Sequence, residues 1–135
     1  MSASPSHTVS TGSWTFSIGA EFELIDNGNS VQAVDGSRVV YVSSLSVGNG
    51  GHPVPVTQLR AAALKRLGSG ERLSHTSGAA QGDAEILPID GGWRLQGTMC
   101  RDGTIATCVI DYGKESERTW AISVWTSLLC SGERL

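Results

Sequence analysis

Few side chains in this 135-residue sequence are placed to do acid–base or nucleophilic chemistry. Its three histidines are His7, His52 and His75. A hydrolase triad needs a histidine that a carboxylate orients beside a nucleophile, and no motif around these histidines would arrange that. His52 has the best position, because it lies in the Gly/Pro-rich residues 48–55 and loops often carry functional sites. The sequence predicts no catalytic residue; it leaves catalysis open but favours a protein that is not an enzyme.

Two pairs of carboxylates have the i, i+2 spacing that puts both side chains on one face of a strand. They are Glu21 with Glu23, and Asp83 with Glu85. A calcium site would need an Asp-rich loop beside such a pair, and the sequence contains none. The glycine-rich residues 48–51 lack the Lys-Ser or Lys-Thr of a phosphate-binding loop. We interpret both pairs as solvated strand faces, and predict neither a metal site nor a cofactor.

The three cysteines are Cys100, Cys108 and Cys130. Their spacing fits no common zinc ligand pattern. Cys100 and Cys108 fall on neighbouring predicted strands, so a cross-strand contact between them is geometrically allowed. In a reducing compartment we expect all three to be free, buried, small apolar side chains. The redox state of Cys100 and Cys108 stays open at this point.

Composition and charge narrow the classes of partner. The formal net charge is −3, whereas nucleic-acid and anionic-membrane binders need a surplus of Lys and Arg. No stretch approaches the roughly 18 apolar residues that a membrane span requires. Residues 1–12 are polar and lack the charged start and apolar centre of a signal peptide. We expect a cytoplasmic bacterial protein that binds neither nucleic acid nor membrane.

Apolar and polar residues alternate at a period of two in most of the chain, which predicts strands. The predicted strands are 14–18, 31–34, 38–47, 72–76, 84–89, 93–99, 104–110 and 119–129. Asp102-Gly103 predicts a tight hairpin turn between two of them. Residues 38–47 are apolar on both faces near their start, which is typical of a central strand covered on both sides. Residues 72–76 are predicted as an edge strand.

One helix is predicted, over residues 57–67. Its apolar stripe at helical spacing is Leu59, Ala62, Ala63 and Leu67. Arg60 and Lys65 are expected to point outward. The fold class is therefore α+β: a mostly antiparallel twisted sheet of about six or seven strands, with one main helix packed on one face. Residues 1–12 are expected to form a flexible tail, and residues 13–130 one domain.

A helix of about ten residues spans little more than ~15 Å, so it covers only part of one sheet face. Loops or a partner must cover the rest. Tryptophan is enriched at binding hot spots, and the chain has four. The candidate binding residues are Trp93, Trp120, Trp125, His52 and Tyr112. The long apolar strand 119–129 is predicted to lie inside the sheet or to form a symmetric contact in a homodimer.

The order of these elements resembles the PsbP-like α/β/α sandwich family, which includes Ran-binding nuclear import factors and bacterial chaperones for secreted toxins. The resemblance rests on residues 12–18, 37–42, the helix 57–67 and the ending 119–128. Members of that family usually carry a further helix after the last strand. With 119–129 interpreted as a strand, only residues 130–135 remain for that helix.

Two functions are open from the sequence. The leading one is a non-enzymatic bacterial protein-binding domain, of adaptor, chaperone or immunity type, that uses a sheet face. The alternative is a small-molecule binding or catalytic domain with a pocket between the sheet and the helix. In that case His52, His75, Tyr112 and Asp111 would be its polar groups, because a ligand pocket needs convergent polar side chains in an apolar cleft.

Overall fold

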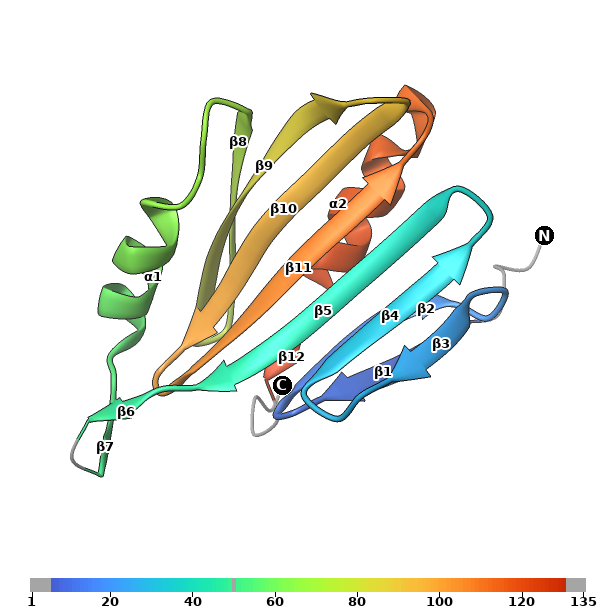
Figure 1. Ribbon diagram of the computed structural model, residues 1–135. Coiled ribbons are helices and arrows are strands. Elements are labelled where there is room, and N and C mark those ends of the chain that lie inside the picture. Colours follow the sequence, from blue (N-terminus) through green and yellow to red (C-terminus); the bar gives the residue numbers. More distant parts are fainter. Residues whose placement is uncertain (1–5, 50, 131–135) are drawn as a thin grey trace.

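The computed structural model describes residues 6–49 and 51–130. Its main feature is a seven-stranded antiparallel sheet (Figure 1). In spatial order the strands are β3 (Glu23–Asp26), β4 (Ser30–Asp35), β5 (Arg38–Ser46), β11 (Thr104–Tyr112), β10 (Gly92–Arg101), β9 (Ala80–Ile89) and β8 (Glu71–Ser77). The expectation of an α+β fold with a mostly antiparallel sheet is confirmed. The edge position of the strand predicted at 72–76 is confirmed by β8.

A smaller sheet lies behind the main one, with the order β1 (Ser6–Thr11), β2 (Trp14–Gly19) and β12 (Leu129–Cys130) (Figure 1). The prediction of a flexible tail is wrong for residues 6–11. They pair with β2 along their whole length, and Val9 is buried opposite Phe16. Residues 1–5 lie outside the described residues. A short hairpin, β6 (Gly48–Asn49) and β7 (His52–Pro53), follows β5.

The structure has two α-helices among its described residues, where one main helix was predicted. The predicted helix 57–67 is confirmed as α1 (Val56–Leu64), which contacts β9 and β10. The second helix, α2 (Arg118–Thr126), follows the short 3-10 turn η1 (Glu115–Glu117). Figure 1 shows α1 beside the β8–β9 end of the sheet and α2 behind β10 and β11.

The prediction of a strand at 119–129 is wrong, because this segment is mostly α2. Its buried residues are Ala121, Val124, Trp125 and Leu128. They recur at i, i+3, i+4 and i+7, which is the spacing of one helix face. The homodimer contact predicted through this strand therefore loses its basis.

The hydrophobic core lies between the main sheet and the layer made by β1, β2 and α2. The sheet contributes alternate residues such as Val40, Val42, Leu95, Met99, Cys108 and Ile110. Trp14 and Phe16 of β2 and Trp125 of α2 close it from the other side. We call this side of the main sheet the core face, and the opposite side the open face. No helix among the described residues is both long and apolar enough to cross a membrane.

Candidate functional site

The open face is defined by the register of the central strands, because directly paired residues point to the same side of a sheet. Tyr41, Ser43 and Leu45 of β5 pair with Val109, Thr107 and Ile105 of β11. These three residues of β11 pair in turn with Gln96, Thr98 and Cys100 of β10. The strand β5 is central, as predicted, but it is covered on one side only: the side chain of Tyr41 remains 40% exposed.

Large apolar side chains are exposed mainly on this face. Ile25, Tyr41 and Leu45 are 54%, 40% and 63% exposed. Ile25 belongs to the same face, since it pairs with Gln32 and Gln32 pairs with Tyr41. Leu24, 40% exposed, points to the other side of the edge strand β3. The open face is thus apolar on β3, β5 and β11, whereas α1 contacts β9 and β10.

A groove of about 560 Å³ runs between α1 and the open face. Its helix wall includes Leu59, Ala62, Ala63 and Leu67, the four residues of the predicted apolar stripe. Its floor includes Ser43, Leu45, Ile105, Thr107 and Val109. This volume is within the range of ligand-binding clefts. An apolar lining with a few polar groups is also typical of such clefts.

A polar network holds α1 over the sheet. The guanidinium of Arg60 donates to both carboxylate oxygens of Asp83, at 2.7 and 2.9 Å, and also to Gln81 at 3.2 Å. Ser74 donates to the same carboxylate at 2.8 Å. The hydrogen bond from Arg60 outweighs burial and holds the pKa of Asp83 below its usual range. Arg60 therefore does not point outward as expected, but anchors the helix.

Glu85 anchors the segment that follows α1. Its carboxylate is 1% exposed and accepts hydrogen bonds from the backbone N–H of Gly68 and Gly70 and from the amide of Gln96, at 2.7–3.0 Å. Burial acts to raise the pKa of Glu85, but these hydrogen bonds outweigh it and hold the pKa below its usual range. The interpretation of Asp83 and Glu85 as a solvated strand face is wrong, because both are buried and bonded.

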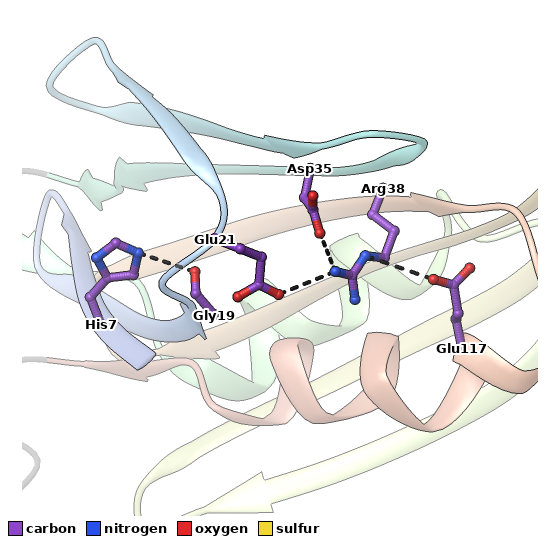
Figure 2. Close-up of polar contacts among 6 residues, drawn as sticks. All are labelled: His7, Gly19, Glu21, Asp35, Arg38 and Glu117. Atoms are coloured by element: carbon purple, nitrogen blue, oxygen red, sulfur yellow. Dashed lines mark hydrogen bonds and ion pairs between the residues drawn. The ribbon is translucent and has the colours of Figure 1, made fainter. Parts of the chain in front are cut away.

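A second polar cluster surrounds Arg38 at the start of β5, and Figure 2 shows its guanidinium among three carboxylates. It binds Asp35, lies 3.2 Å from Glu21 and lies 3.7 Å from Glu117. The rings of Phe22 and Trp120 stack at 5.7 Å, and the guanidinium carbon is 4.9 Å from each ring centre. This cluster joins the β4–β5 turn to α2. We assign it a structural role, because its ion pairs and ring contacts already occupy Arg38.

Of the five candidate binding residues, the structure pairs Trp93 with Tyr112 but does not gather the five into one site. Trp93 and Tyr112 are cross-strand partners, and Tyr112 is buried. Trp120 is half-buried on Phe22, whereas Trp125 is buried and donates to the Thr98 carbonyl at 3.2 Å. His52 is exposed on β7, apart from the others.

The four polar groups predicted for a pocket between sheet and helix are also scattered, and none of them lines the groove. Asp111 forms an ion pair with Arg94 at 2.7 Å on the open face. His75 packs against Trp125, with ring centres 6.0 Å apart, and Tyr112 is buried on the core face. The groove lies between the sheet and α1, where the alternative function required a pocket, but the four residues predicted for that pocket do not line it. The residues named above that do line the floor of the groove lie at alternate positions within 38–47 and 104–110. The alternation of these two strands was therefore the sequence signal that could have identified them.

The cysteines lie in separate places. Cys100 pairs with Ile105 and Cys108 with Gly97, so the two thiols point to opposite faces and the cross-strand contact is excluded. All three cysteines are free and buried. Burial raises the pKa of Cys100, and raises the pKa of Cys108 to about 12. Within the described residues no three His, Cys, Asp or Glu side chains gather in a way that could hold a metal ion.

These thiols are expected to react slowly with a thiol reagent in the folded protein, because the thiolate is the nucleophile and the burial of Cys100 and Cys108 suppresses it. Titration with Ellman's reagent at pH 8 should give little product in buffer and three thiols per chain in denaturant. Rapid labelling of Cys108 in buffer, mapped by mass spectrometry, would contradict its position in the core.

Comparison with known proteins identifies the fold alone. No family model matches the chain, and no curated protein matches it. A crystal structure of a protein from Bacteroides thetaiotaomicron VPI-5482 is similar in fold, with a TM-score of 0.61 and 13% sequence identity. The alignment covers 91% of this chain and 47% of that one, so this chain spans about half the length of its structural neighbour.

Proposed function

We propose that this chain is a non-enzymatic protein-binding domain, of adaptor, chaperone or immunity type, that receives its partner on the open face. One observation carries the proposal: three of the four large exposed apolar side chains of the described residues lie on that face, namely Ile25, Tyr41 and Leu45. Contiguous exposed apolar surface is typical of interaction sites. The groove beside α1 extends the same surface.

Two further features support this proposal. The resemblance to the PsbP-like family, whose members usually carry a further helix after the last strand, is part of this proposal: α2 follows β11, the last strand of the main sheet along the chain, and precedes the short strand β12. We also propose that the protein works in the bacterial cytoplasm, and the three buried free thiols are compatible with such a reducing compartment.

The test is a pair of variants on opposite sides of the sheet. Tyr41→Asp with Leu45→Asp puts charges on the open face, while Leu24→Asp alters a side chain as exposed as Tyr41 on the other side. We expect a partner that co-purifies with the wild type to be lost with the first variant and kept with the second. A second copy of the chain would appear as a dimer in light scattering that only the first variant dissociates. Equal capture by all three proteins would contradict the proposal.

The groove favours a second candidate function, the binding of a small apolar molecule. Its volume of about 560 Å³ and its apolar lining with a few polar groups are typical of small-molecule sites. A ligand that binds only the folded state raises the melting temperature. A shift with small apolar molecules and none with candidate proteins would place this function first.

A further inference from the structure

The lining of the groove is almost free of charge. Among the described residues that line it, Arg66 is the one charged side chain. The acidic residues Asp83, Glu85 and Asp111 of the open face do not line the groove, and they are bound by Arg60, by the backbone after α1 and by Arg94 respectively. Arg66 is exposed just past the end of α1, and it forms no ion pair with any residue of 6–49 or 51–130. A ligand in the groove would meet this cation without a competing carboxylate.

The floor of the groove has a banded pattern. Ser43, Thr107 and Thr98 are direct cross-strand partners, so their hydroxyl-bearing side chains form a row across three strands. Leu45 and Ile105 form an apolar row on one side of it. On the other side the row contains Val109 and Gln96. The floor and the Leu59–Ala63 wall therefore suit an apolar chain, and Arg66, which also lines the groove, suits an anionic head group on that chain.

We propose that the groove binds an alkyl carboxylate, with the hydrocarbon chain on the floor and the carboxylate at Arg66. This inference rests on the second proposed function, since it names the ligand class for the same groove. A guanidinium pairs with a carboxylate through charge-assisted hydrogen bonds. The protein as a whole carries a net charge of −3, so a preference for an anion must come from a local cation and not from the overall field.

The probes are three ligands with the same chain and different head groups: octanoate, 1-octanol and octylammonium. Isothermal titration calorimetry of the wild type at pH 7 and low salt should give the tightest binding for octanoate. We expect octanoate to bind about 1.5- to fivefold more tightly than octanol, the range for one exposed ion pair, and octylammonium to bind more weakly than either. The preference for octanoate should shrink as salt is added, because salt screens exposed charges.

Matched variants locate the effect. Arg66→Gln should reduce octanoate binding to the level of octanol, whereas Lys65→Gln removes a neighbouring charge that does not line the groove and should change nothing. Ala62→Phe fills the groove from its wall and should abolish binding of all three ligands. Ala61→Phe, on the exposed helix surface outside the groove, is its control. Thr107→Phe, at an exposed floor position, blocks the groove independently.

The outcomes separate the inference from the function on which it rests. Equal affinity for the three head groups, or a preference that survives in Arg66→Gln, overturns the alkyl carboxylate and leaves groove binding in place. Absence of binding by every probe, or binding that Ala62→Phe and Thr107→Phe both leave intact, overturns the small-molecule function and the inference together.

Discussion

Trp125→Ala is expected to remove most of the stability of this protein. The side chain is 1% exposed at the centre of the core, and the loss of a buried tryptophan typically costs about 3–5 kcal/mol. Natural domains are stable by only about 5–15 kcal/mol, so the free energy of unfolding should fall by a large fraction. Chemical denaturation followed by circular dichroism measures the loss.

The same helix provides the control for this prediction. Val124→Lys should be as damaging as Trp125→Ala, because it places an ammonium group in a buried position, while Ser123→Lys should have little effect because residue 123 is exposed. Adjacent buried positions at 124 and 125 are expected of a helix face, and not of a strand in which neighbours point apart. Tolerance of Val124→Lys would show that α2 does not pack on the sheet.

Glu85→Gln is expected to be the next most damaging change, after Trp125→Ala and Val124→Lys. One of the two acceptor oxygens would become an NH2 group, which would face the N–H groups of Gly68 and Gly70 or the amide of Gln96, so buried donors would be left without an acceptor. Leaving a buried donor unsatisfied costs about 1–3 kcal/mol, and more where a charged acceptor is lost. We expect a loss of at least about 2 kcal/mol at pH 7 by the same denaturation assay.

The pH dependence of this loss has a definite sign. The folded pKa of Glu85 lies below its unfolded value, so the carboxylate stabilises the fold above the unfolded pKa of about 4.3, and this contribution is lost as pH falls through the folded pKa. The difference in stability between wild type and Glu85→Gln should therefore be constant near neutral pH and shrink in acid. A difference that grows in acid would mean that the carboxylate is not bonded as described. Gln32→Glu is the control, because it exchanges the same two side chains in the opposite direction on the open face. It shows how much a change of one charge alters stability by itself.

Much of the fold could be predicted from the sequence, because the signals were local. Alternation at a period of two located β2, β4, β5, β10 and β11, and helical spacing located α1. Asp102-Gly103 predicted the β10–β11 hairpin, where Gly103 adopts a φ of 80°. A positive φ of this kind suits glycine, which has no side chain to clash.

Two of the elements that the sequence did not predict correctly are the helix α2 and the strand β1. Residues 119–129 alternate in polarity and also repeat at helical spacing, so either a strand or a helix would bury part of their apolar residues. Packing decided between them, since only the helix buries Ala121, Val124, Trp125 and Leu128 on one side. The strand β1 has one buried apolar residue, Val9, and its polar composition concealed its pairing with β2.

The sequence by itself determined the residues of the groove wall and the alternation of the strands beneath it. It could not determine which sheet face would stay open, because that depends on where β1, β2 and α2 pack. Nor could it predict that Asp83 and Glu85 would be buried, since their partners Arg60 and Gly68 lie far away in the sequence. A carboxylate is normally solvated, and only the tertiary structure supplies the donors that make its burial favourable.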